Sequence, residues 1–375
     1  MGFREFWKLK QFKCMAQSQF DTFNVTDLKT WTEAAKKELG GKDPFDALTI
    51  SKNDLSIKPY YDKEDIEGLT INKLRPSSNP YLGPRGWYNT PAIAVRNCKE
   101  ANKLALEYLN SGADGIQFTL EVEAELEQLL DKIELPYCSI FFVVKTGHSK
   151  ILGDFAHYVK NKDFDKTQIV GGIFWQTPFD ISSLSLQYLE GWDNFHALGY
   201  IVPQTEGPID EIVDALLAGV SLLDSNEGNA AQLLQQLTFS YSIGTDFFME
   251  IAKLKAFRRL WQQVSHAYDV KDNSLLLHGI SNPWNKESFQ PNANMIKSTT
   301  AALSAILGGC EAITIMPEED NSFKNRIARN VLTVLREESH LNQTADAVAG
   351  SYYLESLIEQ MAKIAWAKFQ QKINT

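Results

Sequence analysis

From about residue 91 onward, short apolar runs alternate with segments of helical periodicity. The runs lie at 115–120 (GIQFTL), 139–144, 169–175, 196–202, 239–243, 275–280 and 312–316, with a weaker one at 344–348. The helical patterns lie at 91–110, 208–223, 244–268, 291–307, 320–337 and 352–371. Near-continuous apolar strands separated by helices are typical of a parallel sheet that is covered on both faces.

Eight such units, in a chain of 375 residues, are what a closed barrel of alternating strands and helices requires. We therefore predict the α/β class, with a (β/α)8 TIM barrel and an extended N-terminal arm. An open, doubly wound sheet is the alternative. No G-x-G-x-x-G string follows the first run, so the sequence does not favour a dinucleotide-binding sheet.

The first 90 residues have a different character. The segment TWTEAAKKEL at 30–39 predicts a short helix that ends at Gly40-Gly41, and a long irregular segment punctuated by prolines follows it. Such segments usually wrap a surface or line a site. We predict two parts: an N-terminal helix with an extended arm at 1–90, and a barrel at 91–375.

Charge and cysteine usage exclude several classes of function. The net charge is −10, and the Lys and Arg residues are dispersed, which argues against a nucleic-acid or anionic membrane partner. No apolar run approaches the roughly 18 residues of a membrane helix, and the N-terminus lacks the apolar core of a secretory signal. The four cysteines form no C-x-x-C pair, so we predict reduced thiols and a cytoplasmic protein.

Barrels bind ligands at the carboxyl ends of their strands. Polar residues near the predicted strand ends are Glu121, Lys145, His148, Gln176, Tyr200, Gly244, His278, Ser281, Asn282 and Glu318. This set contains no carboxylate pair, Schiff-base lysine pocket or His/Asp metal set. Polar groups satisfied at the starts of loops are the simpler interpretation of each residue.

Three stretches are more specific: 246–261 (DFFMEIAKLKAFRRLW), 326–338 (RIARNVLTVLREE) with 345–355 (ADAVAGSYYLE), and 80–96 (PYLGPRGWYNTPAIAVR). Together they resemble the methylmalonyl-CoA mutase family of adenosylcobalamin-dependent acyl-CoA mutases, from about residue 25 to the end. The resemblance implies a (β/α)8 barrel with the acyl-CoA substrate threaded along its axis. It also implies a separate C-terminal, flavodoxin-like domain that binds cobalamin.

The cobalt-ligand motif of this family, Asp-x-His-x-x-Gly, does not occur in the sequence. We therefore expect the C-terminal cobalamin-binding domain to be absent, and this chain alone to bind no cofactor or metal. Adenosylcobalamin is then expected on a partner chain. Whether Thr375 is the natural end of the protein is left open.

The sequence also departs from the family at the reacting centre. Catalytic members carry Gly-Tyr-His at the end of a middle strand, and the matching string here is Gly199-Tyr200-Ile201. Isoleucine cannot donate a hydrogen bond to a thioester carbonyl, and the loss of one such donor typically lowers the rate about 10²–10³-fold. We expect no catalytic residue in this chain, with Tyr200 left as a remnant candidate.

The arm shows a third departure. Catalytic members follow the arm tyrosine with Arg-Pro-Trp-Thr-Ile-Arg, whereas only Tyr88 and Arg96 match here, which makes Tyr88 the second remnant candidate. The segment 281–303 shows a similar loss of the family pattern. Arg75, Arg85 and Arg96 are the candidates for residual acyl-CoA binding, because arginine is well suited to clamp phosphate.

These departures keep the residues expected to form the barrel but replace those expected to take part in the reaction. We therefore predict a non-catalytic small subunit, resembling those of heterodimeric methylmalonyl-CoA mutases, that supports a catalytic large subunit. One alternative is an active acyl-CoA mutase barrel that works with a separate cobalamin-binding chain. Another is an unrelated ligand-binding barrel or solitary enzyme.

One further stretch imitates an acid/base site. Glu337, Glu338, His340 and Asp346 crowd into a short segment. The helical spacing places the first three on the last turn of a helix and at its exit, where we expect solvated or local contacts. We expect 346–351 to form the eighth strand and its glycine turn.

Overall fold

The structure is a computed structural model that describes residues 27–77, 79, 81–145, 150–176, 186–271, 275–282 and 293–374. The chain divides into two compact units, Met1–Glu67 and Gly68–Thr375.

The described residues of the first unit form two short α-helices and a hairpin. The helices are α2 (Leu28–Glu38), close to the predicted 30–39, and α3 (Pro44–Leu48); the strands are β1 (Ile50–Lys52) and β2 (Leu55–Ile57). Asn53 and Asp54 have positive φ angles of 53° and 64°, the left-handed conformation that suits a two-residue hairpin turn. The ring of Trp31 stacks on Tyr60 with centroids 5.0 Å apart.

The second unit contains a parallel sheet. Its strands are β3 (Tyr88–Asn89), β4 (Ala92–Val95), β5 (Gly115–Leu120), β6 (Ser139–Val144), β7 (Val170–Trp175), β8 (Asn194–Ile201), β9 (Leu237–Ile243), β10 (Leu277–Ser281) and β11 (Ala312–Thr314). They pair in the order β3-β11-β10-β9-β8-β7-β6-β5-β4. The seven apolar runs predicted from 115–120 to 312–316 all coincide with strands.

The first and last members of this order belong to one stretch of chain. Only Thr90 and Pro91 separate β3, which pairs with β11, from β4, which pairs with β5. The N–H of Thr90 donates to the carbonyl of Ile313 (3.0 Å), and the N–H of Gln117 donates to the carbonyl of Pro91 (3.1 Å). The sheet therefore closes on itself through a single interrupted strand, which confirms the predicted barrel.

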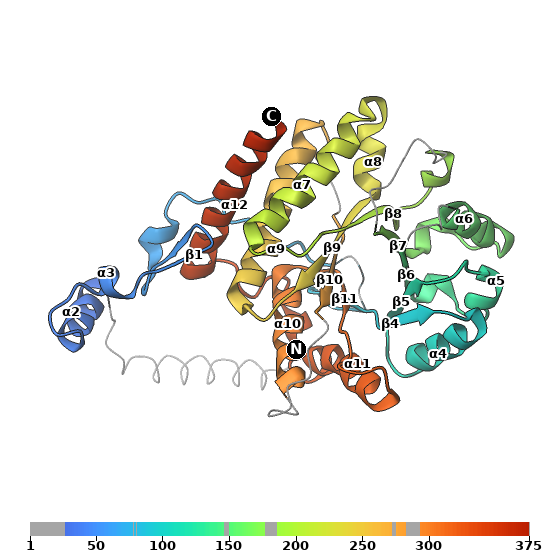
Figure 1. The fold of residues 1–375 in the computed structure, drawn as a ribbon, viewed down its shortest axis with the longest axis horizontal. Coiled ribbons are helices and arrows are strands. Elements are labelled where there is room, and N and C mark those ends of the chain that lie inside the picture. Colours follow the sequence, from blue (N-terminus) through green and yellow to red (C-terminus); the bar gives the residue numbers. More distant parts are fainter. Residues whose placement is uncertain are drawn as a thin grey trace, which may run out of the picture. The chain divides into compact units, whose positions relative to one another are not determined.

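Helices surround the strands of this unit (Figure 1). They are α4 (Cys98–Asn110), α5 (Leu126–Leu129), α6 (Ile151–Asn161), α7 (Pro208–Asp224), α8 (Ala230–Gln236), α9 (Phe247–Ala267), α10 (Ala293–Gly308), α11 (Ser322–Glu337) and α12 (Tyr352–Ile373). Each predicted helix from 208–223 onward corresponds to one of them, with ends shifted by a few residues.

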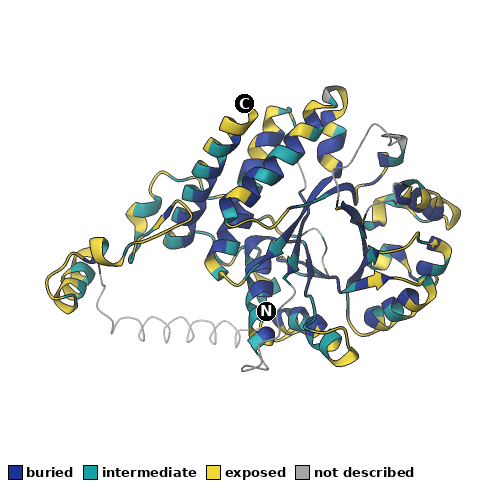
Figure 2. Ribbon diagram, viewed as in Figure 1, coloured by how far each residue is buried: buried dark blue, intermediate teal, exposed yellow. Residues whose placement is uncertain are grey.

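Burial is concentrated in the strands and on the helix faces that cover them (Figure 2). The outward side chain of Phe239 in β9 meets Trp261 of α9 edge to face, with ring centroids 4.8 Å apart. Gly219 of α7 permits this packing, because a Cβ at that position would lie 2.4 Å from the Trp261 ring. Such aromatic burial is a large part of what holds a helix layer to a sheet.

The ends of the predicted barrel require correction. The prediction of an eighth strand at 344–348 is wrong, because these residues form neither a strand nor a helix. The missing strand is the β3–β4 segment, which begins at Tyr88. The predicted boundary at residue 90 therefore falls inside a barrel strand, and the arm residues 68–87 belong to the same compact unit as the barrel.

Candidate functional site

One side of the barrel's carboxyl end carries a charged group. Arg96 follows β4, Glu121 follows β5 and Lys145 follows β6. The Nε atom of Arg96 lies 2.8 Å from Oε2 of Glu121, and Nζ of Lys145 lies 3.5 Å from Oε1 of the same carboxylate. The hydrogen bond from Arg96 lowers the pKa of Glu121. Arg96 is thus paired with a carboxylate, although 76% of its side chain is exposed.

On the other side of this end, polar contacts connect residues of neighbouring strands, loops and helices. Oε1 of Glu318 accepts a hydrogen bond from Asn294 (2.7 Å), and Oε2 forms an ion pair with Lys324 (2.6 Å). The hydroxyl of Ser281 accepts from the N–H of Met316 (2.8 Å). These side chains hold one another. His148 lies outside the described residues, as do the segments 146–149, 177–185 and 283–292.

Aromatic rings fill the middle of the barrel. The imidazole of His278 on β10 lies 5.9 Å from the ring of Phe141 on β6 and 5.0 Å from the ring of Phe174 on β7, measured between centroids. The two phenyl rings are 5.8 Å apart. Because β10 is separated from β6 and β7 by β8 and β9, these rings meet across the interior of the barrel.

The imidazole of His278 is held on both of its nitrogens. Nδ1 lies 2.7 Å from the hydroxyl of Ser240, and Nε2 lies 2.9 Å from that of Thr314. Thr314 in turn donates to the carbonyl of Thr90 (2.6 Å). Burial lowers the pKa of His278 to about 3. A neutral imidazole with both nitrogens engaged is a packing element rather than an acid, base or metal ligand.

Ile201, the residue in place of the family histidine, joins this interior. The buried cluster consists of Phe141, Phe174, Leu276 and Ala312, with Tyr88, Val143 and Ile201 packed against it. The position expected to hold the reacting group therefore contributes apolar surface to the barrel core.

Tyr200 faces the opposite way. Its hydroxyl donates a 2.7 Å hydrogen bond to Oδ2 of Asp214, on the outer helix α7. Burial, together with this bond, raises the pKa of Tyr200. Neighbouring residues of a strand point to opposite faces, so Ile201 inside places Tyr200 outside.

The two remnant tyrosines are not brought together. Tyr88, at the start of the interrupted strand, packs against the interior cluster, and its hydroxyl lies 3.4 Å from Nδ2 of Asn79. Burial raises the pKa of Tyr88. The hydroxyls of Tyr88 and Tyr200 thus end on different partners, one on the arm and the other in the helix layer.

The three arginines proposed as phosphate ligands also lie apart. The buried guanidinium of Arg85 donates to the carbonyls of Ile306 (2.8 Å) and Cys310 (2.5 Å), just before β11 begins. This is the amino-terminal end of the barrel, whereas Arg96 follows the carboxyl end of β4. Arg75 is exposed on the irregular arm.

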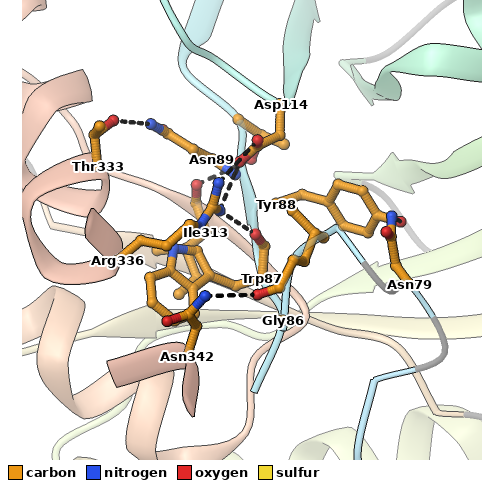
Figure 3. Close-up of polar contacts among 12 residues, drawn as sticks. Asn79, Gly86, Trp87, Tyr88, Asn89, Asp114, Ile313, Thr333, Arg336 and Asn342 are labelled. Atoms are coloured by element: carbon orange, nitrogen blue, oxygen red, sulfur yellow. Dashed lines mark hydrogen bonds and ion pairs between the residues drawn. The ribbon is translucent and has the colours of Figure 1, made fainter. Parts of the chain in front are cut away.

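A polar latch ties the arm to the barrel at this amino-terminal end (Figure 3). The guanidinium of Arg336 in α11 contacts both oxygens of Asp114, at 3.0 and 2.7 Å, and donates to the carbonyl of Trp87. Its Cζ lies 5.0 Å over the Trp87 ring. Asn89 donates to the carbonyl of Arg329 in the same helix (2.9 Å). The family-specific stretch 326–338 thus has a structural use here.

The stretch that imitates an acid/base site is dispersed. Glu337 ends α11, and Glu338 and His340 follow it in exposed positions, as expected. The side chain of Asp346 is buried, and its carboxylate forms a 2.6 Å ion pair with Lys255 of α9 and accepts from the N–H of Leu74 (2.9 Å). It therefore fastens the arm and α9 together instead of facing a substrate.

The described residues contain neither a cluster of metal ligands nor a helix able to cross a membrane. No three His, Cys, Asp or Glu side chains among them are gathered as metal ligands would be. None of the helices in this part of the chain combines the length and apolar character needed to cross a membrane.

Comparison with known proteins gives a consistent result. The family model described as methylmalonyl-CoA mutase matches residues 224–374. The methylmalonyl-CoA mutase small subunit of Porphyromonas gingivalis is 28% identical over 93% of this chain and 63% of its own length. The small subunit of Streptomyces virginiae is 37% identical over 36% of this chain and 23% of its own length.

The methylmalonyl-CoA mutase of Escherichia coli is 23% identical over 92% of this chain and 58% of its own length. The chain thus spans about three fifths, or less, of these curated relatives. The matched region contains strands β9 to β11 and helices α8 to α12. These similarities support the methylmalonyl-CoA mutase family for this chain, with the family model matching its C-terminal part.

Proposed function

We propose that this chain is the small, non-catalytic subunit of a heterodimeric, adenosylcobalamin-dependent methylmalonyl-CoA mutase, which interconverts methylmalonyl-CoA and succinyl-CoA. Its barrel would stabilise the catalytic large subunit and would have no acyl-CoA site of its own. We place this function in the cytoplasm.

The filled barrel axis carries the proposal. An acyl-CoA threaded along the axis would need the space that the rings of Phe141, Phe174 and His278 occupy. All three side chains are buried, and Ile201 packs against the same cluster. Removing such rings to open a path would leave cavities, each at a cost of about 3–5 kcal/mol for a phenylalanine.

Two observations on this chain's own residues support the assignment of the cofactor to the partner. The cobalt-ligand motif does not occur in the sequence. His196 and His278, the two buried histidines of the described strands, hydrogen-bond to neighbouring barrel groups. The partner is proposed because relatives carry the names of small and large subunits.

Two measurements on the purified chain test this function. Isothermal titration calorimetry with methylmalonyl-CoA should give no heat of binding. Size-exclusion chromatography with the cognate large subunit should give a stable complex, and mutase activity should exceed that of the large subunit alone. Failure to form a complex would contradict the proposed role.

An Ile201→His variant separates this proposal from the active-barrel alternative. If the barrel were a working site that lacks one hydrogen-bond donor, restoring the imidazole should raise turnover by about 10²–10³-fold. We expect no gain, because the filled axis still excludes the substrate. Val143→His, at another position packed on the same cluster, is the matched control for the change in side chain.

A further inference from the structure

A buried charge cluster lies between the sheet and the helix layer. Nζ of Lys253 in α9 lies 2.6 Å from Oε2 of Glu211 in α7 and 2.7 Å from Oε2 of Glu250. It also donates to the carbonyl of Ser242 at the end of β9 (3.1 Å). The side chains of Lys253, Glu211 and Glu250 are 1%, 8% and 13% exposed. Two carboxylates face one ammonium, so with all three ionised the cluster carries one excess negative charge.

The two carboxylates are not equivalent. Glu211 accepts a hydrogen bond from Lys253 and a second one from the N–H of Thr205 (3.4 Å). Oε2 of Glu250 is close enough to Lys253 for an ion pair, but it is buried and makes no hydrogen bond within the described structure. Its charge is therefore the less well stabilised of the two.

Besides Lys253, a backbone hydrogen bond from Gly244 stabilises the charged form of Glu250, but the nearby side chains are acidic or neutral. On α7, one turn beyond Glu211, Asp214 is already engaged with the Tyr200 hydroxyl. On β9, the ring of Tyr241 lies 5.6 Å from Nζ of Lys253, and its hydroxyl is buried without a partner in the described structure. The thiol of Cys310, ahead of β11, is also buried. Among the described residues, Lys253 is thus the cation that forms ion pairs with Glu211 and Glu250.

We propose that Glu250 is the proton-binding member of this cluster, and that the proton it takes up tightens the junction between the β8–α7 and β9–α9 units. A protonated carboxyl removes the excess charge from a medium that solvates charge poorly, and it leaves Glu211 and Lys253 as a matched pair. In agreement with this geometry, burial raises the pKa of Glu250.

The direction of the pH effect follows from linkage. A carboxyl whose pKa is higher in the folded than in the unfolded protein favours folding at low pH, and this stability is lost as the pH rises above the ordinary value of 4.5. Glu250→Gln keeps the shape and a hydrogen-bonding group but cannot ionise. The variant should therefore not lose this stability as the pH rises.

The test is thermal unfolding of the full chain, followed by circular dichroism at about pH 5 and at about pH 8. Relative to the wild type, E250Q should have a higher Tm at the upper pH, and the difference between the two proteins should shrink at the lower pH. Glu359→Gln is the matched control, since Glu359 pairs with Arg259 and Lys363. Although burial opposes it, these bonds lower the pKa of Glu359, so E359Q should lose stability at the upper pH.

Infrared spectroscopy locates the proton. The wild type at acidic pH should show the carbonyl band of a protonated, buried carboxyl, and E250Q should lack it. The proposal is overturned if E211Q abolishes the band and E250Q does not, or if E250Q lowers the Tm equally at both pH values. Failure of E250Q to fold also overturns it, because a neutral amide should be tolerated where a neutral acid is.

Discussion

Asp114 and Arg336 hold each other through two hydrogen bonds, Nη1 to Oδ1 at 3.0 Å and Nη2 to Oδ2 at 2.7 Å. Asp114 lies at the start of β5, and Arg336 lies in the last turn of α11. Because the same guanidinium reaches Trp87, this pair joins the arm, the sheet and the helix layer at one point.

Arg336→Ala should destabilise the protein by about 2–3 kcal/mol, because it leaves a largely buried carboxylate and a carbonyl without their donor. Urea unfolding, followed by tryptophan fluorescence, measures the change as a lower midpoint. Arg326→Ala is the control: this exposed arginine of α11 lies over the ring of Phe323, and its loss should change stability by less than about 0.5 kcal/mol. Equal midpoints for the two variants would refute the role of the latch.

Asp346→Ala should cost about 3–5 kcal/mol, because it leaves the ammonium of Lys255 buried without a counter-charge and the N–H of Leu74 without its acceptor. A double-mutant cycle with Lys255→Met isolates the pair. The double variant should be more stable than the sum of the single effects implies, by about 0.5–3 kcal/mol. Simple additivity would mean that the two groups do not interact in solution.

His278 should make the free energy of unfolding depend on pH in the acidic range. Because burial lowers its pKa to about 3, the folded protein binds no proton there between about pH 6.5 and pH 3, while the unfolded chain does. Stability should therefore fall as the pH drops through this range, by about 1.4 kcal/mol per pH unit from this residue.

Urea midpoints measured across this range test the prediction with two variants. His278→Asn should have the shallower slope, because it removes the titrating group. Thr314→Val takes away one hydrogen-bond partner of the imidazole, so it should be less stable at every pH yet keep the wild-type slope. An unchanged slope in H278N would show that the imidazole is not the source.

Tyr200→Phe should affect stability and leave catalysis unchanged. The hydroxyl supports Asp214 in the helix layer, so its removal should cost about 1–2 kcal/mol. Mutase activity of the complex with the large subunit, compared at a temperature well below the Tm, should equal that of the wild type. A loss of turnover without a loss of stability would return Tyr200 to the reacting centre.

Periodicity predicted seven of the eight barrel strands because their residues are apolar and continuous. The first strand escaped it, since Asn89, Thr90 and Pro91 interrupt the apolar pattern of 88–95. These are the residues at which the strand changes partner, from β11 to β5, so the departure from the pattern has a structural use. Periodicity instead predicts the eighth strand at the weak run 344–348. This run contains Asp346, whose buried ion pair is with Lys255, so the residues next to it in sequence do not reveal it.

The site was less accessible to sequence reasoning than the fold. The resemblance identified Ile201 as the replaced position, but the direction of its side chain needed the closed barrel. A shift of register in the β7–β8 pairing, between Gly172 and Phe174, changes which residues face inward. The inward direction of Ile201 on β8 therefore depends on a local irregularity that a period of two does not predict. The runs SIFFVV and IFW supplied the rings but not their orientation.

Closure of the barrel through residues 88–95 also bears on how the chain folds. Thr90 and Thr314 make a 3.0 Å contact across 224 positions of sequence. Contacts between such distant residues slow folding, because the loop between them must be ordered before they can form. During synthesis β3 has no pairing partner until β11 has left the ribosome. Unpaired strand edges of this kind promote aggregation. This late pairing therefore sets when the chain becomes a finished barrel.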